Sequence, residues 1–294
     1  MTTTALERDA RGGGGFGYRH PQARLAALLG APLAWLVVVY LGSLAALLLT
    51  AFWTVDGFTG AVVRTFTLQN FIDVFTTSAY LQVIARTIAI ALAVTVLCIV
   101  IALPLAFFMA RVARPRWQPL LVAMILTPLW ASYLVKVYAW RAMLNPETGV
   151  IAWLLHPFGL GGPGYGELGI VITLTYLWLP YMILPVYAGF SRLPNSMLDA
   201  SADLGARSWR TFRSVIVPII FPSIVAGSIF TFSLSLGDYI TAQIVGGKTQ
   251  MLGNVVQQNY VTNLPFAAAF ATVPVIIVLI YLAAVRRTGA LENV

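Results

Sequence analysis

The sequence predicts an all-α integral membrane protein that crosses the bilayer six times. Of its 294 residues, 59% are hydrophobic and 10% are charged, whereas an ordinary soluble domain carries about 25% charged residues. A soluble fold of this size could not cover its surface with so few charges. The hydrophobic residues also occur in long blocks, and a block of roughly 20 apolar residues is long enough to span a bilayer as a helix.

Six blocks have this length, at residues 25–54, 87–110, 119–140, 168–190, 215–236 and 267–285. The first block is too long for the apolar part of a signal peptide, so we expect it to remain as an anchor. Prolines inside the blocks predict bent helices, which suit a transport bundle better than a rigid scaffold. Residues 1–24 contain a glycine run and few apolar residues, which predicts a disordered cytoplasmic tail. Residues 25–294 are expected to form one transmembrane domain.

The basic residues predict the orientation of the spans. Thirteen of the eighteen lysines and arginines lie in the tail, in the loops after the second and fourth blocks, and at the C-terminal end. The positive-inside rule places these segments, and therefore both termini, in the cytoplasm. The whole net charge of +8 falls on that side. This asymmetry explains the pI of about 9.9 better than nucleic-acid binding does.

Residues that carry enzymatic or metal chemistry are sparse. Cys98 stands alone inside the second block, which excludes an intrachain disulfide and a thiolate metal cluster. His20 and His156 have no partner at ligand spacing. We therefore expect no catalytic residue, no metal and no cofactor in this chain.

One stretch approximates a phosphate-binding loop. Residues 242–249 read Ala, four residues, then Gly247-Lys248-Thr249. A phosphate-binding loop joins a strand to a helix, but this stretch follows a membrane helix on the outer side. We interpret it as a glycine turn with a surface lysine, so ATP is not expected to bind here.

The loop at residues 191–214, between the fourth and fifth blocks, is predicted to fold as two short helices. Ser196 followed three residues later by Asp199 matches a capping box, and Gly205 stands where a left-handed C-cap would end the first helix. Ser208 can cap a second helix that continues into the fifth block. One face of that second helix is apolar and consists of Trp209, Phe212 and Ile216.

This loop is either a basic segment that touches anionic lipid or a docking element. The first helix carries small residues, Ala200 and Ala202, which would let another surface approach closely. Two capped helices with a small-residue face are more than lipid binding needs. The pattern therefore favours a docking element.

The loop resembles the EAA loop of the permease subunits of binding-protein-dependent ABC importers. That consensus reads Glu-Ala-Ala, three residues, Gly, nine residues, then Ile-x-Leu-Pro. The match here is Asp199-Ala200-Ser201, Gly205 and Val215-Ile216-Val217-Pro218, with mild substitutions and the spacing kept. The resemblance implies a type I ABC importer permease fold with a transmembrane core at about 86–287 and a cytoplasmic coupling helix. The implied ATPase-docking residues are Asp199, Ala200, Ser201, Gly205, Ala206, Arg210 and Pro218.

Three further stretches resemble the permeases of spermidine/putrescine importers. They are TPLWASYLVKVYAW at 127–140, NPETGVIAWLL at 145–155 and LGDYITAQIVGG at 236–247. The resemblance implies a bacterial inner-membrane protein that pairs with a second permease of a different sequence. It also implies two cytoplasmic ATPases and an outer solute-binding protein as partners. ATP and magnesium would then bind to the ATPase, and this chain would be a non-catalytic translocation subunit.

The substrate path is expected beside an acidic residue and aromatic rings at the outer ends of the spans. The candidates are Asp238, Tyr239, Tyr133, Trp140 and Tyr176. A carboxylate near a span is a functional candidate, and aromatic faces attract ammonium groups. Alternatively, Asp238 is an interhelical cap and the aromatic residues form an interfacial belt.

Alternative substrates within this family are amino-acid derivatives, opines and ferric iron. A secondary transporter is the rival class, but it would place ionisable residues deep inside the spans. The middles of the six blocks have none.

Overall fold

The computed structural model describes residues 28–30 and 32–287, so the predicted tail at 1–24 lies outside the described residues. In the described part of the chain, five helices are long and apolar enough to cross a membrane. They are Leu28–Thr50, Ser78–Val112, Glu167–Arg192, Ser208–Leu236 and Leu264–Arg286. Each coincides with one of the predicted blocks, and Ser78–Val112 and Ser208–Leu236 begin well before their predicted bounds.

The remaining predicted span, at 119–140, is a bent pair of helices. α6 (Gln118–Trp130) and α7 (Tyr133–Met143) meet at an angle of 92°. The chain is extended at Ala131 and Ser132, where ψ is 143° and 137°. Pro128 lies in the last turn of α6, where it removes a backbone donor. The sequence missed this break, and six spans result if the pair counts as one.

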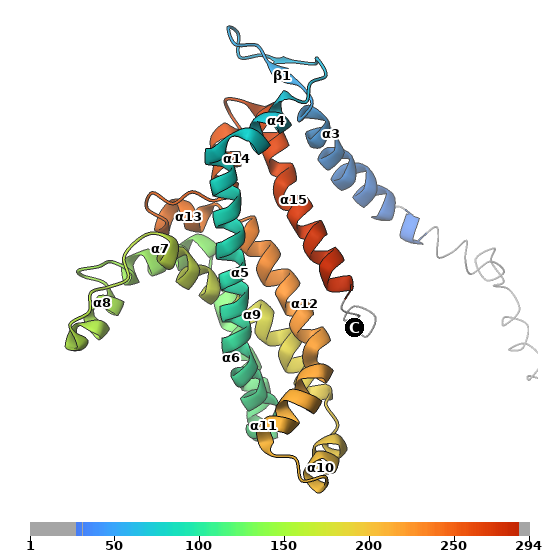
Figure 1. The fold of residues 1–294 in the computed structure, drawn as a ribbon, viewed down its shortest axis with the longest axis vertical. Coiled ribbons are helices and arrows are strands. Elements are labelled where there is room, and N and C mark those ends of the chain that lie inside the picture. Colours follow the sequence, from blue (N-terminus) through green and yellow to red (C-terminus); the bar gives the residue numbers. More distant parts are fainter. Residues whose placement is uncertain (1–27, 31, 288–294) are drawn as a thin grey trace, which may run out of the picture.

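Three long helices form the centre of the bundle (Figure 1): α5 (Ser78–Phe107), α9 (Glu167–Arg192) and α12 (Val217–Leu236). α9 and α12 approach so closely that a Cβ on Gly227 would lie 2.7 Å from the sulfur of Met182. Cys98 is buried in this core and donates to the carbonyl of Thr175 at 3.6 Å. Cys98 therefore packs as a small buried residue of the core.

α15 (Leu264–Arg286) packs on α12. The rings of Phe232 and Tyr281 stack with centroids 4.5 Å apart, and the Tyr281 hydroxyl donates to Ser228 at 2.7 Å. The first span, which includes η2 (Leu36–Leu41) and α3 (Gly42–Thr50), leads away from the bundle (Figure 1), and none of its most apolar window is buried.

The short elements separate to the two ends of the bundle (Figure 1). One end carries α10 (Asn195–Asp203) and α11 (Ser208–Thr211). The opposite end carries the antiparallel pair β1 (Thr54–Val55) and β2 (Val62–Val63), with α4 (Gln69–Thr76), α13 (Ile240–Val245) and α14 (Leu252–Asn259). α8 (Val150–Leu155) follows α7 and lies off to one side of the bundle. The sequence assigned these two groups to opposite sides of the bilayer, and the fold keeps them apart.

The stretch that approximates a phosphate-binding loop follows a helix. α13 ends at Val245, and Gly246 and Gly247 make the turn, with φ of +60° at Gly247. Lys248 is exposed at the surface. The interpretation as a glycine turn with a surface lysine is confirmed.

Candidate functional site

The first helix of the loop at residues 191–214 begins one residue before its predicted cap. The N-cap of α10 is Pro194, and no side chain caps the helix. Ser196 therefore lies inside the first turn, where its hydroxyl cannot accept the first free amides. The capping-box prediction for Ser196 and Asp199 is wrong because Pro194 already sets the extended conformation that precedes a helix.

The C-terminal end of α10 agrees with the sequence. Gly205 has φ of +70°. Its N–H donates to the carbonyl of Ala202 at 2.8 Å, and the N–H of Ala206 donates to that of Ser201 at 3.1 Å. These two bonds form a Schellman motif, which needs a left-handed residue at the glycine position. The predicted left-handed cap is confirmed.

The second helix runs into the fifth span, as predicted. α11 continues through the π-helical turn η6 (Phe212–Ile216) into α12. Its N-cap is Arg207 without a side-chain hydrogen bond, and Ser208 is already helical. The prediction that Ser208 caps this helix is therefore wrong by one residue.

A groove of about 600 Å³ lies against the loop. Four of the predicted docking residues line it, and they are Ala200, Ser201, Ala206 and Arg210. The side chain of Ser201 is buried, and its hydroxyl lies 2.8 Å from that of Thr211. Asp199 and Pro218 are exposed outside this lining. The loop thus surrounds this hollow with small residues, one arginine and the larger apolar side chains of Met197, Leu204 and Val215.

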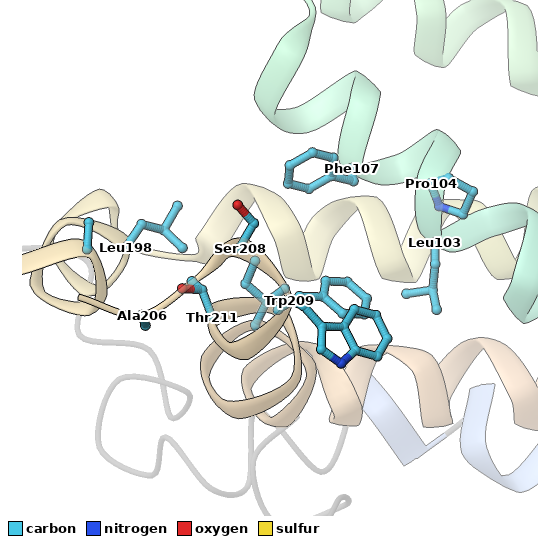
Figure 2. Close-up of a pocket in the computed structure, with 11 residues that line it drawn as sticks. Leu103, Pro104, Phe107, Leu198, Ala206, Ser208, Trp209 and Thr211 are labelled. Atoms are coloured by element: carbon cyan, nitrogen blue, oxygen red, sulfur yellow. The ribbon is translucent and has the colours of Figure 1, made fainter. Parts of the chain in front are cut away.

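A second, apolar cavity of about 660 Å³ lies between the loop and α5 (Figure 2). Leu103, Pro104 and Phe107 form its α5 wall. The predicted apolar face is confirmed, because Trp209, Phe212 and Ile216 all line this one cavity. The rings of Trp209 and Phe212 stack with centroids 5.7 Å apart.

At the opposite end of the bundle, Asp238 joins two helices. Its carboxylate accepts the Thr241 N–H at 2.8 Å and the Thr241 hydroxyl at 3.2 Å, and also accepts the hydroxyl of Tyr133 on α7. Only 8% of Asp238 is exposed. Asp238 therefore makes the contacts of an interhelical cap, which is one of the two roles that the sequence left open. The sequence analysis missed Thr241, although an acidic residue three positions before a helical amide is a capping signal.

Aromatic rings fill the contact between α7 and α9. Tyr133 stacks on Trp178 with centroids 5.9 Å apart, and Trp140 lies 5.3 Å from Tyr176. Four of the five candidate path residues therefore gather at this contact or at the adjoining carboxylate of Asp238. Within the described residues, the indole nitrogen of Trp178 is buried and has no hydrogen-bond partner.

The fifth candidate, Tyr239, lies apart from this cluster. It lines a separate cavity of about 390 Å³ with Gln257 and Tyr260 of the α14 region. Its backbone carbonyl accepts the side-chain amide of Asn254 at 2.9 Å. The structure does not bring Tyr239 together with the other aromatic candidates.

The bundle and its end loop have the fold of the membrane subunits of ABC importers. A subunit of a bacterial ABC transporter involved in the import of the acidic polysaccharide alginate superposes with a TM-score of 0.71, at 15% identity, covering 96% of this chain and 98% of that one. A chain of the MetNI methionine ABC transporter superposes with a TM-score of 0.55, at 18% identity, covering 73% of this chain and 95% of that one. At these identities the likeness establishes the fold alone.

Sequence establishes the family. Residues 102–287 match the binding-protein-dependent transport system inner membrane component family, and the chain belongs to it. It is 42% identical to the inner membrane ABC transporter permease protein YdcU of Escherichia coli over 99% of both chains. It is 30% identical to the spermidine/putrescine transport system permease protein PotB of Haemophilus influenzae, over 80% of this chain and 84% of PotB. The chain is therefore an ABC importer permease subunit, a class that translocates without being catalytic.

Proposed function

We propose that this chain is the permease subunit of an ATP-driven, binding-protein-dependent importer for spermidine, putrescine or a closely related polyamine. The observation that carries the substrate class is the similarity to PotB along 80% of the chain. Both termini and the loop at 191–214 would face the cytoplasm, because the basic residues concentrate there.

The substrate path would run beside the contact between α7 and α9. A polyamine carries several ammonium groups, and each one can lie over an aromatic face for about 0.5–2 kcal/mol. Tyr133, Trp140 and Tyr176 would supply such faces. Asp238 would add a negative charge next to Tyr133, and Tyr239 would extend the path into the neighbouring cavity.

The loop at 191–214 would dock on a cytoplasmic ATPase. Helix α10 presents the exposed residues Asp199 and Ala200, and the adjoining groove carries Ala206 and Arg210. Small side chains allow a close approach, and Arg210 can bind an acidic group on the partner. ATP and magnesium would bind to that partner, since residues 242–249 form the end of a helix and a glycine turn in place of a phosphate-binding loop. A second permease and an outer solute-binding protein would complete the importer.

Reconstitution tests this proposal. The full chain would be purified with its companion permease and ATPase, placed in proteoliposomes that contain ATP, and supplied with the solute-binding protein and radiolabelled spermidine or putrescine. We expect uphill uptake that stops when any one component is omitted. Uphill uptake by this chain alone would overturn the importer assignment. Uptake of an amino-acid derivative but of neither polyamine would overturn the substrate class alone.

A further inference from the structure

Helix α10 directly neighbours only two of the three central helices in the sequence. It follows α9 through Leu193 and Pro194, and it precedes α12 through α11 and η6. The third central helix, α5, ends at Phe107 and continues into the π-helical turn η3 (Phe108–Val112), far before α10 in the sequence. A movement of α10 therefore reaches α5 through the contacts that α5 and η3 make with α9, α12 and the loop.

Arg111 in η3 makes the polar connection between α5 and the start of α10. Its Nη1 donates to the side-chain oxygen of Asn195 at 2.6 Å, and its Nη2 donates to the backbone carbonyl of Leu193. These two acceptors flank Pro194, so the guanidinium holds the residues at which α9 ends and α10 begins. In the described part of the chain, Nε of Arg111 is buried and has no hydrogen-bond partner.

The chemistry of this contact requires arginine. The planar fork of a guanidinium reaches two acceptors at once, whereas a lysine ammonium is a single point of charge. The carbonyl of Leu193 lies directly after α9, where a cation interacts favourably with the negative end of the helix dipole. Hydrogen bonds from a charged donor are also stronger than neutral ones.

Apolar packing connects α5 to α9 next to the loop, where the rings of Phe107 and Phe190 meet with centroids 5.6 Å apart. The apolar cavity of about 660 Å³ separates the α5 wall from α10 and α11 (Figure 2). The last α5 residue in that wall is Phe107, and Arg111 follows one helical turn later. α5 ends in the π-helical turn η3, and α11 ends in the π-helical turn η6. Such turns are frequent at functional sites.

We infer that Arg111 is a positioning residue that links α10 to α5, so that a displacement of α10 moves α5 together with α9 and α12. This inference rests on the proposed docking of α10 on an ATPase. Without the Arg111 link, α10 moves relative to α5 and the bundle responds incompletely to the ATPase.

The test compares Arg111→Ala, Arg111→Lys and Asn195→Ala with wild type. Arg114→Ala is the matched control, since Arg114 is exposed three residues further on and its side chain makes no hydrogen bond or ion pair within the described residues, while its backbone carbonyl, which accepts the N–H of Trp117, is unchanged by the substitution. Hydrogen exchange is measured on the full chain in lipid nanodiscs. We expect amides at 199–203, which are hydrogen-bonded within α10, to exchange about tenfold faster in Arg111→Ala, less so in Arg111→Lys and Asn195→Ala, and at the wild-type rate in Arg114→Ala.

The second measurement uses the reconstituted importer and reports spermidine molecules moved per ATP hydrolysed. We expect Arg111→Ala to lower this ratio about tenfold, while subunit assembly and basal ATP hydrolysis stay within about twofold of wild type. A residue that only supports folding would lower assembly and both rates together, without changing the ratio.

Two results would overturn the inference. Unchanged exchange at 199–203 in Arg111→Ala would show that Arg111 does not hold α10, whatever the cargo is. Faster exchange with an unchanged transport-to-ATP ratio would show that the link does not transmit movement. If the wild-type complex fails to move spermidine, that result counts against the proposed substrate instead. The Arg111 variants would then be compared by the stimulation of ATP hydrolysis by the binding protein, in place of the ratio of transported spermidine to hydrolysed ATP.

Discussion

The hydroxyl groups of Ser201 and Thr211 lie 2.8 Å apart and join α10 to α11. Ser201 is 7% exposed, so its side chain faces the interior of the loop while Asp199 and Ala200 remain at the surface. The bond closes the turn at Gly205 from the inside. The two short helices therefore form one folded unit, as a rigid docking element requires.

Because of this hydrogen bond, substitutions at Ser201 and Thr211 should have non-additive effects on the stability of the loop. We expect Ser201→Ala or Thr211→Val alone to destabilise the loop by about 1–3 kcal/mol, because each leaves a polar group without its partner. The double variant should be no worse than either single one, since both polar groups are then gone. Hydrogen exchange of residues 195–204 measures the effect, with the exposed Ser196→Ala as control. Additive losses would show that the two hydroxyls are not partners.

Substitutions at Gly205 should impair coupling to the ATPase in a graded order. No neighbour lies within 4 Å of a Cβ added at Gly205, so a side chain there acts through the backbone alone. At φ of +70° an ordinary residue costs about 1–2 kcal/mol, and asparagine tolerates this conformation best. Stimulation of ATP hydrolysis by the binding protein should fall least in Gly205→Asn, more in Gly205→Ala and most in Gly205→Val.

Membrane insertion of all three Gly205 variants should stay at the wild-type level, because the bundle does not depend on this turn. Equal stimulation in wild type and Gly205→Val would show that the left-handed turn is not needed for coupling. Loss of insertion in the same variant would show that the turn supports folding instead.

The sequence was informative where the determining interactions are local. The lengths of the apolar runs predict the spans. The glycine at position 205 predicts the left-handed cap, and helical spacing predicts the shared face of Trp209 and Phe212. The predicted N-caps Ser196 and Ser208 lie two residues and one residue after the observed N-caps, Pro194 and Arg207, because capping residues and first-turn residues have similar compositions.

Contacts between distant segments could not be predicted in the same way. Arg111 and Asn195 are 84 residues apart, and Tyr133 and Asp238 are 105 residues apart. No periodicity connects such pairs. The break at Ala131 and Ser132 was also missed, since both residues lie inside a continuous apolar run and only the packed structure shows the extended backbone there.

A substitution at Asp238 can separate the structural role of its carboxylate from its proposed role in transport. In Asp238→Asn the side-chain oxygen can still accept the Thr241 N–H, so we expect the cap to stay and thermal stability to change little. The negative charge is lost, however, and the apparent affinity for spermidine should fall about tenfold. Tyr133→Phe keeps the charge and the ring, and should affect uptake less. Unchanged affinity in Asp238→Asn would leave Asp238 as a cap only.

Trp140 tests whether the α7–α9 cluster contacts cations. Loss of one aromatic face is worth about 0.5–2 kcal/mol, so Trp140→Ala should weaken apparent spermidine affinity by roughly 2- to 30-fold. Trp140→Phe should recover most of it. Trp153→Ala is the control, because Trp153 lies on α8 and is 74% exposed. Equal effects at both tryptophans would favour an interfacial belt over a substrate path.

The predicted orientation can be tested by labelling single cysteines in intact cells. Cys98 is fully buried, so Cys98→Ala should give a background that folds and carries no reactive thiol. Into it we would introduce Phe58→Cys in the hairpin between β1 and β2, or Ser196→Cys on α10, both at exposed positions. The reagent is a membrane-impermeant maleimide, which is added outside cells that have a permeable outer envelope. It should label position 58 and leave position 196 unmodified, because the basic residues around α10 place that helix in the cytoplasm. Position 196 should react only after the inner membrane is opened. The reverse pattern would place α10 outside the cell, away from ATP, and would exclude its docking on an ATPase.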